Sequence, residues 1–251
     1  MQIKLKSKIF KNKYIYVDYH NNDRAYSLVI FLSGFSGSME PSLFKNGSKF
    51  FLKNNSMARV IFCDDNSEKQ KKDSPKIEQM SFSVYIRELK GIIDFFNKKY
   101  SKIVLIGHSF GAVVSILFLD KYKSYLKKTE LVLWEQSALP WKRELMEASF
   151  TFNPTKKLYY EKNGEAVLNK KFYNELITID TLKVFKKLNK KTCIVAAKGS
   201  ADKDAQKYFS VIHNKKGSQL SIIKGTNHCF KGIKAQKELF EKTLNFTNMK
   251  D

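Results

Sequence analysis

Ser109 stands between two glycines in the segment GHSFG (107–111). An apolar run, IVLI (103–106), comes before it, and a run of small and apolar residues, AVVSILFL (112–119), follows. One interpretation is structural, because glycines allow a strand and a helix to pack closely around a turn. The other is chemical, because this pattern is typical of a nucleophile elbow, a strained turn that lifts a serine hydroxyl above the end of a sheet. The partners of the serine decide between them.

A serine hydroxyl is too weak a nucleophile to attack an acyl carbon without a general base. The chain has four histidines, at positions 20, 108, 213 and 228. His228 lies in GTNHCF (225–230), directly after the last apolar run, QLSIIK (219–224). His108 is inside the elbow and cannot easily turn back to its neighbour's hydroxyl. The sequence therefore predicts His228 as the base.

Three carboxylates compete to orient that histidine. Asp202 follows the apolar run TCIVAAK (192–198), and it preserves the chain order serine, acid, histidine that a nucleophile elbow favours. Asp204 is better explained as the start of a helix, where a carboxylate complements the positive end of the helix dipole. Glu135 ends the run next to the serine strand and stays as the alternative. The sequence favours Asp202 as the acid.

The oxyanion of an acyl-transfer reaction needs two N–H donors. One is expected from Phe110, the residue after the serine. The loop LSGFSGS (32–38) offers the second from Phe35, because Gly34 and Gly37 can turn the backbone amides towards the site. A plain glycine-rich turn is the alternative interpretation of this loop.

The elements that must position these residues form an alternating pattern. Apolar runs predict strands at 14–17, 27–33, 58–63, 102–108, 130–135, 192–198 and 219–224. Most are continuously apolar, as is typical of strands buried on both faces of a parallel sheet. Amphipathic patterns predict helices over 81–100 and 235–246. We expect a single α/β domain over 1–251, with a mostly parallel, doubly wound sheet.

Residues 138–187, called the insertion below, interrupt this alternation between two predicted strands. The insertion is rich in aromatic residues and contains a turn-like KNGE, which favours a small lid over the sheet edge. A long crossover helix is the alternative. Four aromatic residues are predicted to line an acyl pocket, although they could instead form the lid's own core: Trp141, Phe152, Tyr159 and Tyr160.

Composition limits the remaining classes. The net charge of +22 comes mainly from lysine spread along the chain, with only four arginines, which argues against a nucleic-acid partner. Three cysteines without metal-ligand spacing predict free thiols and a cytoplasmic protein. No apolar stretch of about 18 residues and no secretory leader is recognisable, so no stable membrane insertion is expected. No metal or organic cofactor is expected either.

The chain resembles the α/β-hydrolase superfamily from about residue 27 to 246, and within it the small serine esterases of the cinnamoyl/feruloyl esterase and monoacylglycerol lipase type. LSGFSG, GHSFGA, KGSAD and GTNHCF resemble the oxyanion loop, elbow, acid turn and histidine turn of that family. The chain departs from the family at Ser33, where the family usually has histidine. It departs again after Asp64 and Asp65, where the family's glycine-rich turn is missing.

These patterns and the resemblance together predict a hydrolase of carboxylic acyl esters that uses Ser109, His228 and Asp202 through a covalent acyl-enzyme. The expected partner is a small-molecule ester, and the sequence specifies no oligomeric state. Two other classes remain open. One is a different chemistry on the same fold, namely an aminopeptidase, a thioesterase or a carbon–carbon bond hydrolase, and the other is a non-catalytic ligand-binding protein.

Overall fold

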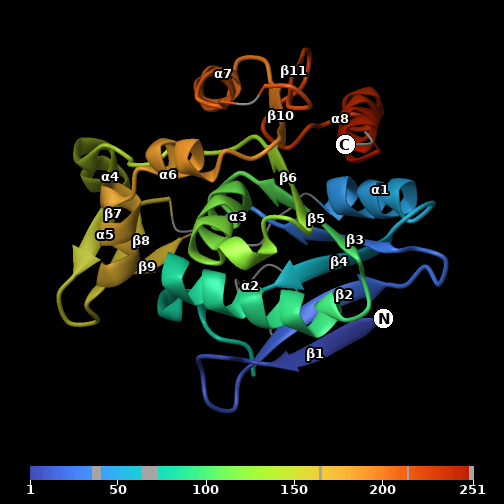
Figure 1. The fold of residues 1–251 in the computed structure, drawn as a ribbon. Coiled ribbons are helices and arrows are strands. Elements are labelled where there is room, and N and C mark those ends of the chain that lie inside the picture. Colours follow the sequence, from blue (N-terminus) through green and yellow to red (C-terminus); the bar gives the residue numbers. More distant parts are fainter. Residues whose placement is uncertain (36–40, 64–72, 164–165, 214, 249–251) are drawn as a thin grey trace.

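The computed structural model describes residues 1–35, 41–63, 73–163, 166–213 and 215–248. Gly37, Asp64 and Asp65 lie outside the described residues. The chain alternates strands and helices along most of this length, as Figure 1 shows.

Eight strands form the main sheet, in the order β1-β2-β4-β3-β5-β6-β10-β11. Their bounds are β1 (Gln2–Lys6), β2 (Tyr14–His20), β3 (Ser27–Leu32), β4 (Ser56–Ile61), β5 (Lys102–His108), β6 (Thr129–Trp134), β10 (Thr192–Ala197) and β11 (Gln219–Ile223). The six strands from β4 to β11 pair in parallel, and β1 and β2 pair antiparallel at one edge. The carboxyl ends of β5, β6, β10 and β11 therefore meet at one edge, where the predicted site residues follow.

Helices cover both faces of the sheet. Figure 1 shows α2 (Phe82–Asn97) and α3 (Phe110–Lys121) on one side, and α1 (Pro41–Phe51) and α8 (Ile233–Thr247) on the other. The further helices are α4 (Arg143–Ser149), α5 (Lys170–Thr178), α6 (Thr181–Leu188) and α7 (Asp202–Ser210), with 3₁₀ turns η1 (Ile77–Gln79) and η2 (Lys123–Tyr125).

Strand alternation divides the core into two apolar layers. In β3, Leu28, Ile30 and Leu32 belong to the layer under α2 and α3, whereas Val29 and Phe31 belong to the layer under α1 and α8. All six residues of β3 are buried, as expected for a strand covered on both faces. This arrangement confirms the mostly parallel, doubly wound α/β fold that the sequence predicts.

The seven predicted strands and both predicted helices are present, with ends shifted by a few residues. The sequence patterns missed β1, which pairs only with β2 and has exposed and half-buried residues in alternation. An edge strand of this kind buries little apolar surface, so it lacks the continuous apolar run that marks the other strands.

The insertion contains a second sheet of three antiparallel strands, in the order β7-β8-β9. These strands are β7 (Phe150–Asn153), β8 (Leu158–Glu161) and β9 (Val167–Asn169). Helices α4 and α5 flank this small sheet, and α6 packs on α3 of the main domain (Figure 1). The insertion is therefore not one long crossover helix.

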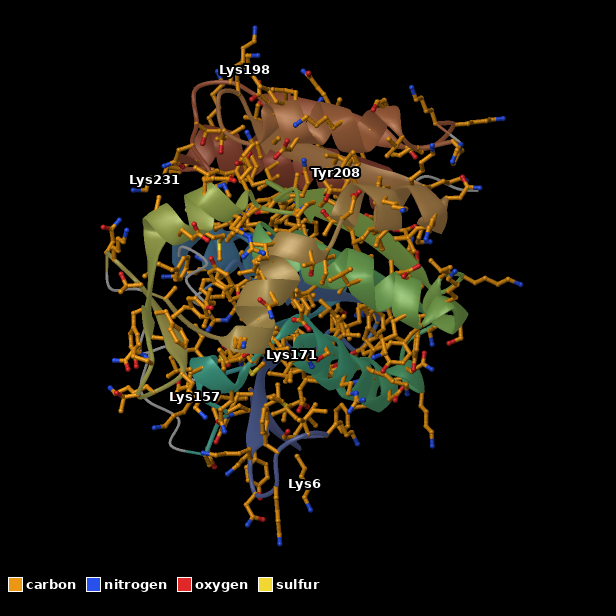
Figure 2. All side chains as sticks on the ribbon, turned by 90° about the vertical axis from the view of Figure 1, so that its left-hand side faces the viewer. Lys6, Lys157, Lys171, Lys198, Tyr208 and Lys231 are labelled. Carbon is orange, nitrogen blue, oxygen red and sulfur yellow. The ribbon has the colours of Figure 1, made fainter. Side chains whose placement is uncertain are left out.

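The lysines project from many elements rather than from one patch. Figure 2 labels Lys6, Lys157, Lys171, Lys198 and Lys231, which lie from one end of the molecule to the other. None of the helices in the described ranges is long and apolar enough to cross a membrane.

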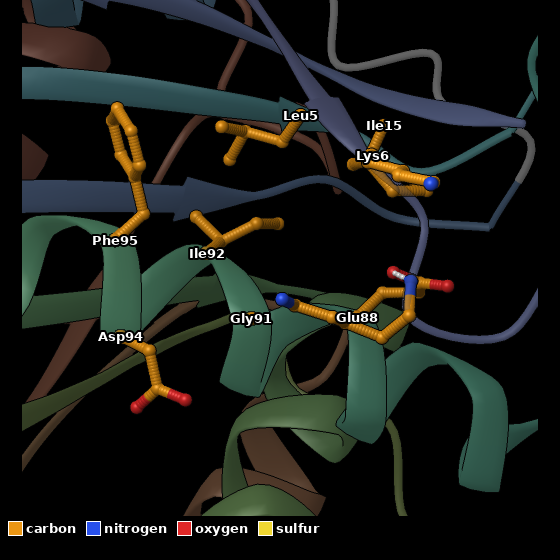
Figure 3. A pocket seen from close by; sticks show the side chains of 9 residues that line it. Leu5, Lys6, Ile15, Glu88, Gly91, Ile92, Asp94 and Phe95 are labelled. Atoms are coloured by element: carbon orange, nitrogen blue, oxygen red, sulfur yellow. Dashed lines mark hydrogen bonds between the residues drawn. The ribbon is translucent and has the colours of Figure 1, made fainter.

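A pocket of about 310 Å³ lies between β1 and α2, at the sheet edge formed by β1 and away from the carboxyl ends of β5 and β6 (Figure 3). Glu88 on its wall is buried and accepts hydrogen bonds from Ser7 Oγ at 2.5 Å, Lys8 N at 3.0 Å and Ile9 N at 3.2 Å. These bonds tie the turn after β1 to α2, which gives Glu88 a structural role.

Candidate active site

Ser109 occupies a sharp turn between β5 and α3. Its backbone dihedrals, φ 53° and ψ −114°, are costly for a residue with a side chain. Its N–H donates to the Trp134 carbonyl at 2.8 Å, which ties the turn to β6. A Cβ at Gly107 would overlap the Ala112 backbone, and a Cβ at Gly111 would overlap the Leu32 carbonyl. The two glycines are therefore required for this turn, and the geometry is that of a nucleophile elbow.

His228 lies in the loop after β11 and pairs with Glu135, which follows β6. His228 Nδ1 lies 2.9 Å from Glu135 Oε2. Because an ionised carboxylate only accepts hydrogen bonds, this contact assigns the proton to Nδ1 and leaves Nε2 of the neutral ring free to accept. The imidazole is 46% exposed and the carboxylate 0%, so the ring can reach a ligand while its partner stays inside the protein.

Glu135 is held by three donors. Besides His228, the Ala197 N–H and the Ser200 hydroxyl both donate to its carboxylate. The residue has φ 48°, a left-handed conformation that turns the chain sharply at the end of β6. Sequence patterns did not single out Ser200, because a serine in a turn carries no signal that reports its tertiary partner.

This pairing corrects the prediction that Asp202 orients the histidine. Asp202 begins α7, where a carboxylate complements the helix dipole, and its Oδ2 pairs with Lys198 Nζ at 3.0 Å. The hydrogen bond from Lys198 lowers the pKa of Asp202. Asp204 lies in the same first turn and pairs with Lys207 at 2.9 Å. Both aspartates are therefore parts of α7, and the alternative, Glu135, is the partner of His228.

The expected oxyanion loop reaches the elbow. A Cβ at Gly34 would lie 3.4 Å from Ser109 Cβ and 3.8 Å from Ser109 Oγ, so any side chain at position 34 would press against the serine. Phe110 is the first residue of α3, and the N–H of a first helical residue has no acceptor within the helix. In the part of the chain that the structure describes, Ser109 Oγ makes no hydrogen bond to His228. The Oγ–Nε2 contact and the oxyanion roles of the Phe35 and Phe110 amides stay predictions.

An aromatic cluster adjoins the elbow. The Phe110 ring contacts the rings of Phe35, Phe82, Tyr85 and Phe172, with centroid distances between 4.9 and 5.6 Å. Phe172 comes from α5, so the insertion contributes a fully buried side chain to the cluster around Phe110, the residue after Ser109.

Of the four aromatic residues predicted to line the pocket, Phe152, Tyr159 and Tyr160 make ring contacts with residues of the insertion. Tyr159 stacks on Tyr173 at 3.9 Å and contacts Phe152 at 4.8 Å. Lys156 lies over the Tyr160 ring, and the backbone N–H of Trp141 donates to the Leu176 carbonyl at 3.0 Å. Trp141 and Phe152 are exposed, and Tyr159 and Tyr160 are half-buried, so the four residues lie at the surface of the insertion rather than in a core. A substrate-binding role for Trp141, Phe152, Tyr159 and Tyr160 stays a prediction.

Burial keeps His108 neutral. The side chain is almost fully buried, and burial lowers the pKa of His108 from 6.5 to about 4. Its Nε2 lies 2.8 Å from the His228 carbonyl oxygen, which can only accept, so Nε2 carries the proton. The sequence excluded His108 as the base, and the structure gives it a different contact with the same loop.

This low pKa predicts acid sensitivity. The unfolded chain gains a proton at His108 below about pH 6.5, whereas the folded chain gains it only near pH 4. The contribution of neutral His108 to the free energy of unfolding is fully present above pH 6.5. It is lost as the pH falls towards 4, by up to about 3 kcal/mol. We expect urea titrations at about pH 7.5 and 4.5 to show a smaller drop in unfolding free energy for His108→Gln than for the unchanged protein. The control is exposed His20→Gln, and parallel curves for all three proteins would contradict the prediction.

Solved structures with the same architecture cover nearly the whole chain. Est1E from Butyrivibrio proteoclasticus is 16% identical, with a TM-score of 0.73 over 99% of this chain and 99% of its own. Alpha/beta hydrolase domain-containing protein 10 from mouse is 11% identical, with a TM-score of 0.69 over 99% and 98% of the two chains. A thermophilic esterase from Thermogutta terrifontis is 12% identical, with a TM-score of 0.67 over 98% and 99%. The protein therefore has the α/β-hydrolase fold, which confirms the fold that the resemblance implies.

One family model matches part of the sequence, including the elbow. The family model described as lecithin:cholesterol acyltransferase matches residues 77–154, which include α2, β5, the elbow, α3 and β6. No curated protein matches the sequence of this chain. One of the similar structures is Est1E with ferulic acid bound.

Proposed function

We propose that this protein hydrolyses carboxylic acyl esters with Ser109, His228 and Glu135. The observation that carries the proposal is the hydrogen bond between the buried Glu135 carboxylate and His228 Nδ1. The loop that carries His228 also contacts the elbow that holds Ser109. The esterases among the similar structures support the same reaction class. Their low identity leaves the choice of ester to experiment.

The reaction uses groups that this chain supplies. The Ser109 Oγ proton moves to His228 Nε2 while Oγ bonds to the ester carbonyl carbon, and Glu135 stabilises the imidazolium. The Phe35 and Phe110 amides donate to the oxyanion of the tetrahedral intermediate. Collapse of the intermediate breaks the bond to the alcohol, which takes the proton from His228. Water then attacks the acyl-enzyme by the same steps, releases the acid and returns a proton to Ser109.

The aromatic cluster supports a proposal for the acyl group. Phe35 and Phe110 carry the proposed oxyanion amides, and their rings pack on each other at 5.5 Å and on buried Phe172. An ester carbonyl bound at these amides would bring the acyl group near the half-buried Phe35 ring, which fits a hydrocarbon or aromatic acyl group better than a charged one.

A substrate panel combined with an active-site probe tests the proposal. We expect turnover of p-nitrophenyl esters and labelling of Ser109 by a fluorophosphonate, located by peptide mass spectrometry. Turnover confined to acyl-CoA thioesters, aminoacyl anilides or carbon–carbon substrates would assign the matching alternative chemistry. Folded protein that neither labels nor turns over any substrate would favour a non-catalytic ligand-binding protein.

A further inference from the structure

We infer that His108 is a positioning residue that fixes the backbone of the catalytic loop at His228. This inference rests on the proposed function, because it gives His108 a role only through the base His228. The sequence of the elbow places His108 next to Ser109, so one short segment would carry the nucleophile and hold the base.

The contact between the two histidines is direct. His108 Nε2–H donates to the His228 carbonyl at 2.8 Å, and the centroids of the two rings are 4.9 Å apart. On its other side, His108 Nδ1 would be 3.5 Å from a Cβ at Gly34. His108 therefore contacts the histidine loop from within the elbow, and its other edge faces Gly34.

The loop around His228 is anchored in the core by the fully buried Phe230 side chain, and polar contacts position His228 itself. The loop lies between β11 and α8, and its internal bonds join near neighbours, such as Phe230 N to the Asn227 carbonyl at 2.8 Å. In the described part of the chain, two hydrogen bonds tie His228 itself to residues far away in the sequence. Glu135 binds Nδ1 of the ring, and His108 binds the backbone carbonyl. Together they fix the ring plane and the position of its Cα, and with them the direction of Nε2.

The burial of His108 is consistent with a side chain held in place to donate a hydrogen bond to the His228 carbonyl. The ring is 3% exposed, and its Nδ1 is buried without a hydrogen-bond partner among the described residues. A buried unpaired acceptor is costly, and a buried apolar side chain would avoid that cost. Among the described residues, the imidazole makes one hydrogen bond, to the His228 carbonyl, so an apolar replacement would lose this bond.

A pair of variants with similar shape isolates the donor. His108→Met and His108→Gln place unbranched side chains of similar size at the site, but only glutamine has an N–H to donate. We expect His108→Met to lower kcat on p-nitrophenyl esters about 10- to 100-fold with KM within about twofold, because a small misplacement of a catalytic group slows chemistry more than binding. His108→Gln should recover kcat to within about fivefold of the unchanged protein.

The control is Ser115→Ala, which removes a buried hydroxyl that bonds to the Gly111 carbonyl on α3 without contacting the His228 loop. It should leave kcat within about twofold. Equal kcat for the two His108 variants, in protein shown to be folded by circular dichroism, would overturn the inference. Failure of the proposed function is distinguishable, because the unchanged protein would then lack ester turnover and fluorophosphonate labelling.

A measurement on the unchanged protein covers the case in which His108→Met does not fold. Nitrogen NMR of the imidazole at about pH 7 should show His108 as the Nε2–H tautomer, with that proton protected from exchange. A ring protonated at Nδ1, or an Nε2 proton that exchanges as in a solvent-exposed histidine, would overturn the inference.

Discussion

Ser109→Ala should lower kcat on esters by about six orders of magnitude, to the rate left by oxyanion donors and substrate binding. The reason is that the covalent step needs the Oγ nucleophile, and no other hydroxyl occupies the elbow. Steady-state kinetics with a p-nitrophenyl ester, with active-site titration of the unchanged protein, measure the loss. Labelling by the fluorophosphonate should disappear in the same variant.

The same substitution should leave stability nearly unchanged. Ser109 is half-buried, its hydroxyl makes no hydrogen bond among the described residues, and alanine meets the same backbone cost at φ 53°. We expect the free energy of unfolding to change by less than about 0.5 kcal/mol. Ser115→Ala, the same chemical change six residues further along the chain in α3, should keep activity. Retained turnover in Ser109→Ala, with a loss of several kcal/mol, would show that the glycine-flanked serine is only structural.

Glu135→Gln should lower kcat by about four orders of magnitude. A neutral amide cannot stabilise the imidazolium, and it can hold the ring in the wrong tautomer, an effect of this size in serine proteases. The variant also weakens the bonds that the Ala197 N–H and the Ser200 hydroxyl donate to the carboxylate. Glu135→Asp keeps the charge and should recover part of the rate. Kinetics on folded protein, checked by thermal unfolding, measure the effect.

Asp202→Asn is the matched control, because it makes the same change from carboxylate to amide in the residue that the sequence favours. Asp202 pairs with Lys198, whose side chain is 60% exposed, and such a pair contributes little. We expect kcat to stay within about threefold. A large loss in Asp202→Asn combined with a small loss in Glu135→Gln would return the acid to the loop after β10.

The choice of acid shows where sequence reasoning stopped. Both Glu135 and Asp202 follow strands whose carboxyl ends meet at one edge of the sheet, so each is placed correctly by the strand pattern. The left-handed turn at Glu135 directs its carboxylate towards Ala197 and His228, whereas the start of α7 takes Asp202 towards Lys198. A left-handed φ at a glutamate has no local sequence signal, because propensities disfavour it.

For the aromatic residues of the insertion too, the sequence shows their number but not their tertiary contacts. Aromatic richness of the insertion is visible in the sequence, but which rings reach the elbow depends on how the insertion packs on the main domain. Phe172 reaches Phe110, whereas Tyr159 stacks inside the insertion on Tyr173. The sequence cannot distinguish an aromatic residue that packs beside the elbow from one that packs inside the insertion, because the same large apolar rings suit both places.

The sequence by itself determined the parallel sheet, the elbow and the position of the histidine, because these follow from local properties. Continuous apolar runs require two covered faces, Gly107 and Gly111 allow the tight turn, and His228 follows the last strand. Tertiary structure alone decided which carboxylate meets His228, and that His108 holds its carbonyl. Those contacts join residues 93 and 120 positions apart, and each depends on the angle at which a loop leaves its strand. Packing of the whole fold sets that angle, and no short segment encodes it.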